Sequence, residues 1–313
     1  MISRRLLRIK ALMAFYAFNR RGDDDLAHAE AELMISIDET YDLYHFLLLL
    51  ILELSDIAGV RISKALQKKI PTEEDLNPQK RFVNNQIIAQ LGQNLALKNY
   101  TSSKNLSWNK NSHLPRLLYN KMIDWEVYQE YMKSGEITYN TDKRFIIRLV
   151  TDMFANSEDL LSNLEEQSIY WNDDIEYVSV MIEKTLKKFK PESRESFPLL
   201  PLYKNDEDEE FVKTLFRKTV LHSEKCSELI DKNTTNWEVE RIALMDILVM
   251  QLAITEMLEF PEIPVKVTLN EYIEIAKDYS TEKSSFFING VLDKILKDFT
   301  ASKRLHKIGR GLL

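Results

Sequence analysis

The stretch ERIALMDILVMQLAITEM, residues 240 to 257, decides the fold class of this chain. From Ile242 to Ile254 it is apolar almost all round, which is typical of a helix at the centre of a bundle. Asp246 and Gln251 are the exceptions. A carboxylate in such surroundings is paired or lies at the rim of the apolar zone. Two interpretations of Asp246 stay open: a salt bridge to a local Arg or Lys, or an acceptor for the amino or imino group of a nucleobase.

The composition favours further helices around this one. The 313 residues include only seven glycines and eight prolines, and a many-stranded sheet needs more turn residues than that. With 44% hydrophobic and 29% charged residues, the chain has the composition of a soluble globular protein with one large domain or two smaller ones. We therefore expect an all-α protein.

Several classes of protein are excluded. The single Cys226 cannot form an internal disulfide and no Cys/His cluster has metal-ligand spacing, which favours a reducing cytosol and no metal or other cofactor.

FLLLLIL, residues 46 to 52, is too short to span a bilayer. Residues 1 to 18 resemble the basic and apolar parts of a signal peptide but lack a cleavage site, so we interpret them as mature protein, with a targeting role as the alternative. We expect a cytoplasmic chain with no membrane partner.

Catalytic motifs are missing from the sequence. It contains no Gly-rich phosphate loop, no G-x-S-x-G, no H-E-x-x-H and no C-x-x-C, and its five histidines are scattered. Paired acids such as Asp173 and Asp174 lie in polar sequence at a helix start, where capping and solvation explain them. We therefore expect no enzyme.

The charges are distributed in blocks. The net charge is −7, yet residues 1 to 22 hold six Lys or Arg and no acid, and residues 23 to 60 hold ten acids and no Lys or Arg. A second basic block, residues 61 to 121, has eleven bases against three acids. A solvated helix face explains any one block, but two basic blocks in an acidic protein also suit a polyanionic partner.

The first basic block is predicted to be a helix from Ser3 to about Phe18. Its apolar stripe occupies positions 6, 9, 13 and 17, and at about 100° per residue Arg4, Arg5 and Arg8 share one arc away from that stripe. The arginines repel one another and oppose the helix dipole, so something else must favour them. An anionic ligand is one explanation, and pairing with the acids of residues 23 to 60 is the other.

The middle of the chain contains helices, a loop and a linker. Helices are expected from about residue 36 to 58, and again within residues 115 to 132 and 142 to 190. NYTSSKNLSWNKNSH, residues 99 to 113, is polar and without periodicity, so a long loop is predicted. Residues 190 to 210 combine three prolines with a run of acids and are the best linker candidate.

A partial internal repeat is visible at an offset of 66 residues. Phe145, Leu149, Ser157, Glu158 and Trp171 match Phe211, Leu215, Ser223, Glu224 and Trp237 without a gap. Any two amphipathic helices share a 3.6-residue period, so both duplication and chance are compatible with this match.

The closing part predicts two more helices. After FPEIPVKV, where Pro261 and Pro264 forbid a helix, Thr268 and Glu271 have the spacing of a capping box. In the final helix, FFINGVLDKI at residues 286 to 295 places Gly290 beside an apolar stripe. A glycine inside a helix costs roughly 1 kcal/mol relative to alanine, so we expect a close approach there by another helix, the commoner reason, or by an RNA backbone.

These motifs together resemble the NusB family of transcription antitermination factors. Residues 237 to 295 carry the family's Trp, its Arg followed by apolar residues, an acid before the apolar helix, the Pro-x-Lys-Val-x-x-Asn-Glu run and the signature Phe-hydrophobic-Asn-Gly-Val-Leu-Asp. Residues 3 to 18 are similar to its Arg-rich opening helix. The matched parts, about 3 to 20 and 211 to 299, cover a little over a third of the chain.

The resemblance implies an all-helical fold of two small bundles and no catalysis. It implies a heterodimer with the small-subunit ribosomal protein NusE. This heterodimer binds the single-stranded boxA element of ribosomal RNA transcripts and acts indirectly on elongating RNA polymerase. The implied RNA-binding residues are Arg4, Arg5 and Arg8 on the arginine-rich motif, Tyr16 on its aromatic, Asp246 on the acidic base-contact position and Phe287 on the last helix, together with Lys10 and Lys283.

The chain departs from the family in two ways. Lys283 stands where the family often has an acid, and about 185 residues separate the opening helix from the C-terminal domain, where the family has a few dozen. We therefore divide the chain into an Arg-rich helix (1–22), a mainly helical insertion (23–205) with the partial repeat at 142–190, a NusB-like C-terminal domain (206–300) and a basic tail (301–313). The basic block of residues 61 to 121 either extends the RNA surface or covers the acidic residues 122 to 212.

Two other functions were weighed against antitermination. NusB-like domains also precede methyltransferase domains, but only about fourteen residues follow the matched region and no Gly-rich cofactor loop occurs. The second alternative is a non-catalytic adaptor in ribosome assembly or between proteins, built on a NusB-like scaffold. Binding to boxA-like RNA separates it from the main hypothesis.

Overall fold

The computed structural model describes residues 1–22, 25–234, 242–281 and 283–312. Within these ranges the regular elements are helices and no strand is present. The all-α prediction is therefore confirmed. The chain forms two compact units: unit 1 comprises Met1 and Asp38–Leu202, and unit 2 comprises Ile2–Ile37 and Tyr203–Leu313.

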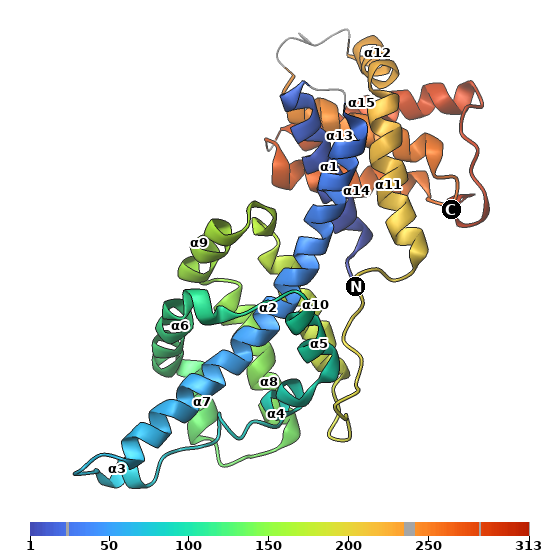
Figure 1. Ribbon diagram of the computed structural model, residues 1–313. Coiled ribbons are helices and arrows are strands. Elements are labelled where there is room, and N and C mark those ends of the chain that lie inside the picture. Colours follow the sequence, from blue (N-terminus) through green and yellow to red (C-terminus); the bar gives the residue numbers. More distant parts are fainter. Residues whose placement is uncertain (23–24, 235–241, 282, 313) are drawn as a thin grey trace. The chain divides into compact units, whose positions relative to one another are not determined.

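Unit 2 is a helical bundle around one apolar helix (Figure 1). Its helices are α1 (Arg4–Arg21), the first part of α2 (Leu26–Leu66), α11 (Asp206–Leu221), α12 (Ser223–Asn233), α13 (Leu244–Glu259), α14 (Val265–Tyr279) and α15 (Ser284–Ala301). Helix α13 packs against α1, α11, α12, α14 and α15, and it is buried almost continuously from Leu248 to Met257. This confirms the prediction of a central bundle helix, because a helix apolar on all sides is stable only when other helices surround it.

Unit 1 holds the rest of α2 and the helices that follow it. These are α3 (Glu73–Leu76), α4 (Gln86–Gln93), α5 (Leu95–Ser103), η1 (Trp108–Asn111), α6 (His113–Asp124), α7 (Glu126–Lys133), α8 (Tyr139–Arg148), η2 (Leu149–Phe154), α9 (Glu158–Gln167), η3 (Ile169–Trp171) and α10 (Ile175–Lys188). The helix expected at residues 36 to 58 is longer in both directions, since it is continuous from Leu26 to Leu66.

The long loop predicted at residues 99 to 113 is wrong, because helix α5 and the short helix η1 occupy most of it. Trp108 is buried, and its ring stacks on Phe46 at a centroid distance of 4.0 Å while its indole N–H donates to the Phe46 carbonyl at 3.0 Å. One aromatic anchor thus orders a segment whose own residues are mostly polar.

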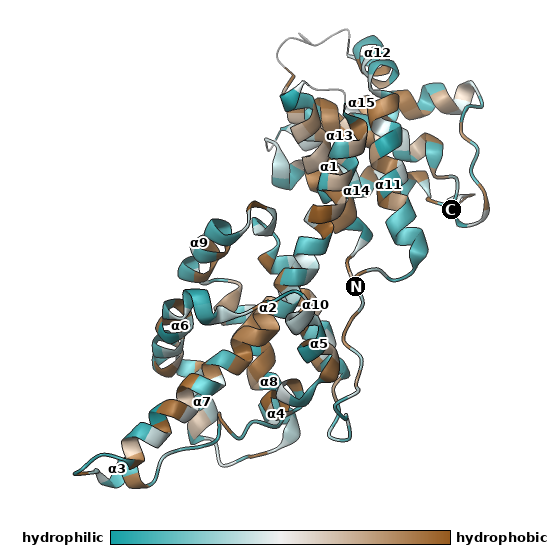
Figure 2. Ribbon diagram, viewed as in Figure 1, coloured by the Kyte–Doolittle hydropathy of each residue, from teal (hydrophilic) through white to brown (hydrophobic). Residues whose placement is uncertain are grey.

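Helix α2 also contains the apolar run FLLLLIL, whose colour in Figure 2 marks the middle of the helix as hydrophobic. Among the described helices it is the one long and apolar enough to cross a membrane by length and composition. However, 61% of its most apolar window is buried inside the protein, which is typical of a core helix.

The linker between the units contains no helix from Phe189 to Asn205. It is nevertheless packed, because Leu199 and Leu200 are buried and the Asn94 amide donates to the Phe197 carbonyl at 2.8 Å. The predicted linker ended with the acidic run of residues 206 to 210. These residues instead begin helix α11, where their charges complement the helix dipole.

The predicted repeat agrees with the helix boundaries. Helix α9 begins at Glu158, 66 residues before Glu224 at the start of α12, and α8 with η2 occupies the place of α11. Both copies bury an aspartate in the first turn of the leading helix, Asp142 and Asp208. Trp237 lies outside the described residues. The agreement supports a duplication, which stays a prediction.

Two predictions for the closing helices are wrong. Thr268 and Glu271 do not form a capping box, because α14 already begins at Val265 after Pro264 and both residues lie inside it. Gly290 does not pack closely, because it is exposed and an added Cβ would meet nothing within 4 Å. The expected close approach of another helix to Gly290 is therefore absent among the described residues.

Replacing Gly290 by Ala is expected to raise the free energy of unfolding by about 0.5 to 1 kcal/mol, since alanine restricts the unfolded chain and the site has room for its methyl group. Urea denaturation followed by circular dichroism measures this change. A lower stability of the Ala variant would show that a close contact exists there after all.

Candidate nucleic-acid interface

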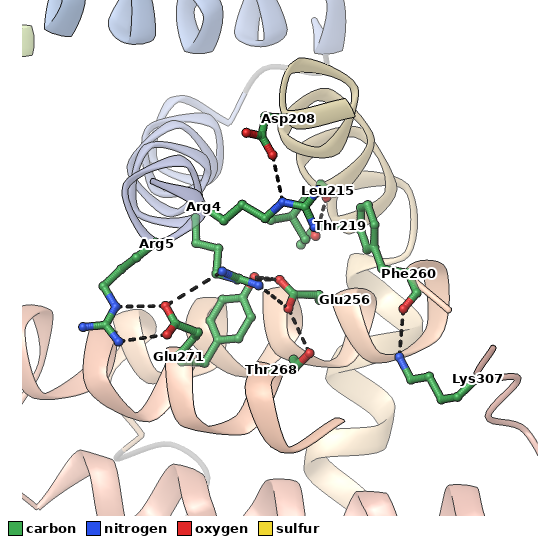
Figure 3. Close-up of polar contacts among 12 residues, drawn as sticks. Arg4, Arg5, Asp208, Leu215, Thr219, Glu256, Phe260, Thr268, Glu271 and Lys307 are labelled. Carbon is green, nitrogen blue, oxygen red and sulfur yellow. Dashed lines mark hydrogen bonds and ion pairs between the residues drawn. The ribbon is translucent and has the colours of Figure 1, made fainter. Parts of the chain in front are cut away.

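The arginines of α1 tie the helix to three different C-terminal helices. Ser3 caps the helix by accepting from the Leu6 N–H at 3.2 Å. Arg4 then donates to Asp208 of α11 at 2.9 Å, and Arg5 donates through two nitrogens to Glu271 of α14, both at 2.9 Å (Figure 3). Arg8 donates through two nitrogens to Glu256 of α13, both at 2.7 Å.

The pair of Arg8 and Glu256 lies in the core. Their side chains are 3% and 0% exposed, and the carboxylate also accepts from the Thr268 hydroxyl at 2.8 Å and from the Tyr272 hydroxyl at 3.2 Å. Burial by itself lowers the pKa of Arg8, but the hydrogen bonds and charge of Glu256 outweigh it, so that the pKa of Arg8 is raised. Arg8 is buried, although it lies on the arc of α1 away from the predicted apolar stripe.

Arg4 and Arg5 keep part of their surface in water, with side chains 39% and 41% exposed. The hydrogen bonds from Arg5 hold the pKa of Glu271 below its usual range. Among the described residues, these arginines pair with Asp208, Glu256 and Glu271, whereas the alternative placed their partners in the acidic block of residues 23 to 60. The arginine-rich motif thus has a structural task in addition to any contact with a ligand.

The two other predicted residues of α1 differ in exposure. Lys10 is buried, whereas the Tyr16 ring is exposed near the C-terminal half of the helix. Tyr16 is therefore available to an external partner, and Lys10 is not on the surface.

Asp246 is bonded to hydroxyl groups, and no ion pair to it is present among the described residues; its predicted contact with a nucleobase stays a prediction. It is buried, and its two oxygens accept from the hydroxyls of Ser280 at 2.5 Å and Ser284 at 2.9 Å. These serines bracket the turn between α14 and α15. Asp246 therefore connects the start of α13 to the end of α14 and to the first residue of α15.

The first two turns of α15 present an exposed surface. Phe287, the predicted aromatic, is half-buried, whereas Phe286 is 83% exposed. Lys283, Asn289 and Gly290 are exposed beside it. We call these four residues, Lys283, Phe286, Asn289 and Gly290, the α15 face.

Sequence reasoning missed Phe286 and Asn289, although the helical period contained the signal. Ile288, Val291, Leu292 and Ile295 are buried, so the residues on the opposite side of α15, including 286 and 290, face water. The family motif instead directed attention to position 287.

The α15 face has the chemistry of a binding surface for single-stranded nucleic acid. An exposed phenyl ring can stack on a base, an amide can pair with a base edge and an ammonium can contact phosphate. Gly290, one turn after Phe286, adds no side chain that would block the approach. The described residues contain no group of three or more His, Cys, Asp or Glu that could hold a metal ion.

Comparisons with known proteins agree on one family. A family model of the NusB family matches residues 181–297. The chain is 46% identical over 114 residues to the transcription antitermination protein NusB of Salinibacter ruber, covering 36% of this chain and 71% of that protein. Identity to the NusB proteins of Chloroherpeton thalassium and Natranaerobius thermophilus is 41% and 35%, covering 33% and 30% of this chain and 49% and 68% of those proteins. No solved structure matches the chain.

The matched family segment has clear limits within the fold. It includes α11 to α15 and thus the α15 face, whereas α1 and most of unit 1 precede it. The similarity therefore bears on Asp246, Lys283 and the start of α15 more directly than on the arginines of α1.

Proposed function

The chain belongs to the NusB family, and on that premise we propose that it is a transcription antitermination factor that binds boxA-like single-stranded RNA of ribosomal RNA transcripts. The ribosomal protein NusE is the proposed protein partner, and elongating RNA polymerase the indirect target. Like the family, the chain acts without catalysis or cofactor, in the cytoplasm.

The α15 face is the observation that carries this proposal. The Phe286 ring is 83% exposed, so a base can stack on it without displacing other side chains, and stacking on such rings is worth about 1 to 3 kcal/mol per base. Asp246, buried behind the turn, keeps Lys283 and Phe286 at fixed positions through Ser280 and Ser284. It acts as a positioning residue in this proposal, not as a base contact.

The arginines have separate roles in the proposed complex. Arg4 and Arg5 are half-exposed and can share their guanidinium donors between a carboxylate and a phosphate, because each guanidinium has five N–H donors. Arg8 is enclosed by Glu256 and Tyr272 and keeps α1 in register. Tyr16 offers a second exposed ring.

One observation favours a second candidate function. Unit 1 is a compact unit, and residues 38–180 of it lie outside the matched family segment. An adaptor that binds other proteins through unit 1, on a NusB-like scaffold, would make use of this additional domain.

Fluorescence anisotropy with a labelled boxA-like RNA tests the proposal. The chain should bind this RNA at least tenfold more tightly than a scrambled RNA of equal composition, and addition of NusE should strengthen the preference. Equal and weak binding to both RNAs, unaffected by NusE, would contradict antitermination through RNA and favour the adaptor function.

A further inference from the structure

The segment after α15 is docked on unit 2. The Arg304 N–H donates to the Phe299 carbonyl at 3.0 Å, which turns the chain back from the helix end. The Ile308 N–H then donates to the Pro261 carbonyl at 3.1 Å, and the Lys307 ammonium donates to the Phe260 carbonyl at 2.9 Å (Figure 3). Residues 302 to 312 therefore lie along the turn between α13 and α14.

Gly311 makes this docking close. A Cβ added to it would lie 1.9 Å from the Pro261 carbonyl oxygen, far inside van der Waals contact. Only a glycine allows the two backbones to approach so closely. The tail thus occupies a defined place on the surface of unit 2.

The docked tail carries positive charge without compensation. Residues 302 to 312 include Lys303, Arg304, His306, Lys307 and Arg310 and no acid. We call the exposed ones, Lys303, Arg304, His306 and Arg310, the tail surface. In the part of the chain that the structure describes, none of these four has an ion pair within 4.0 Å, whereas Arg4, Arg5 and Arg8 each pair with a carboxylate.

The tail is docked beside Phe260, whose ring contacts a residue of α11 that Arg4 also contacts. Arg4 is 5.1 Å from the ring centroid of Phe211, whose ring is 4.9 Å from that of Phe260, and the Phe260 carbonyl accepts from Lys307. Burial lowers the pKa of Lys307, and the negative charge of Glu256, the partner of Arg8, acts in the opposite direction. Arg4 lies over the Phe211 ring and Lys307 is bonded to the backbone of Phe260, so the two cations belong to neighbouring parts of unit 2.

A phosphate binds more favourably to a cationic side chain that does not first have to break an ion pair with a carboxylate. Binding a phosphate to Arg8 would require breaking a buried ion pair, whereas the tail surface exchanges only its diffuse counterions. Acids also lie near the tail: Glu262 is exposed in the turn, Glu259 pairs with Lys218, and Asp298 lies one turn before Ser302 within 3.9 Å of Lys232. The three side chains Lys303, Arg304 and Arg310 have no such carboxylate among the ion pairs of the described residues, so an anion can approach them directly.

We propose that the docked residues 303 to 310 form a second phosphate-binding element, which holds the backbone of a single-stranded RNA bound at unit 2. This inference rests on the proposed function, since it names how the same RNA is held. The contacts are to phosphates, so they strengthen binding equally for boxA-like and scrambled RNA, and their signature is the salt dependence of binding rather than the sequence preference.

The test compares the full chain with the triple variant Lys303→Gln, Arg304→Gln and Arg310→Gln. Anisotropy titrations with both labelled RNAs at several KCl concentrations give the slope of log K against log [KCl]. Loss of three phosphate contacts makes this slope shallower by about 2, since each contributes about 0.7 for single strands. The three side chains are exposed, so the fold is expected to remain, as circular dichroism checks.

The matched control removes the same charge from unit 1. The variant Lys133→Gln, Lys188→Gln and Lys190→Gln replaces three exposed lysines outside the basic block of residues 61 to 121, and its slope should remain that of the unaltered chain. An equal change in both variants would mean a diffuse effect of net charge and would overturn the proposal. So would an unchanged slope in the tail variant, including the case in which that variant loses binding to NusE instead.

A second variant tests the docked position. Gly311→Val keeps every charge but cannot keep the contact with Pro261, so the free tail must be ordered on binding and affinity should fall several-fold. Affinity equal to that of the unaltered chain would overturn the docked element. Absence of preference for boxA-like RNA overturns only the proposed function, whereas absence of any RNA binding overturns both.

Discussion

Arg8→Ala is expected to lower the free energy of unfolding by about 3 to 5 kcal/mol, because it leaves Glu256 charged, buried and without its partner. The Thr268 and Tyr272 hydroxyls still donate to the carboxylate, but they are neutral and cannot replace a guanidinium. Urea denaturation monitored by circular dichroism at neutral pH measures the loss.

The matched control is Arg217→Ala. Arg217 pairs with Glu30 through two hydrogen bonds of 2.8 and 2.6 Å, nearly the geometry of Arg8 with Glu256, but the two side chains are 49% and 17% exposed. Its removal should lower the free energy of unfolding far less than removal of Arg8 does, because water screens an exposed pair. Equal losses of unfolding free energy in the two variants would show that the contribution of the Arg8 pair to stability does not depend on its burial.

This result bears on any test of the arginine-rich motif. A variant in which Arg4, Arg5 and Arg8 are all replaced by alanine would lose RNA binding because unit 2 becomes unstable, even if none of the three side chains contacted RNA. Single substitutions of Arg4 and Arg5, checked for an unchanged unfolding transition, separate contact with RNA from support of the fold.

Phe286→Ala is expected to weaken binding of boxA-like RNA by about 5-fold to 150-fold, which corresponds to 1 to 3 kcal/mol for loss of one stacked base. The ring is 83% exposed, so its removal should leave stability almost unchanged. Phe286→Tyr keeps a ring and should retain the affinity. Anisotropy titration of the three proteins measures both effects.

Leu221→Ala provides the control for exposed apolar surface. Leu221 is 62% exposed at the end of α11, in the same unit, and its removal should not change RNA affinity. If Phe286→Ala also bound as tightly as the unaltered chain, the α15 face would not be the stacking surface, and the half-buried Phe287 would have to be tested next.

The sequence predicted the helices because the helical period is a local property. Positions three and four residues apart share a face whatever the rest of the chain does. The central helix α13 and the Arg-rich α1 were therefore predicted correctly. The closing signature of α15 also led to the correct family, since it is a run of neighbouring residues.

The prediction failed where a contact from a distant part of the chain decides local structure. Residues 99 to 113 contain too few apolar positions to show a period, but Trp108 finds its place on Phe46, 62 residues earlier. Gly290 has a local cost that suggested close packing, yet the surrounding helices leave it open to water. In both cases the deciding neighbours are not visible in the segment itself.

The sequence by itself determined the helical class, the family and the side chains that the proposed RNA interface can use. The tertiary structure alone decided which of them face water: Arg8 pairs with a carboxylate 248 residues away, Asp246 supports a turn, and Phe286 rather than Phe287 is exposed. The physical reason is that helix formation depends on residues three or four positions apart, whereas the burial and pairing of a charge depend on which distant helices pack against it.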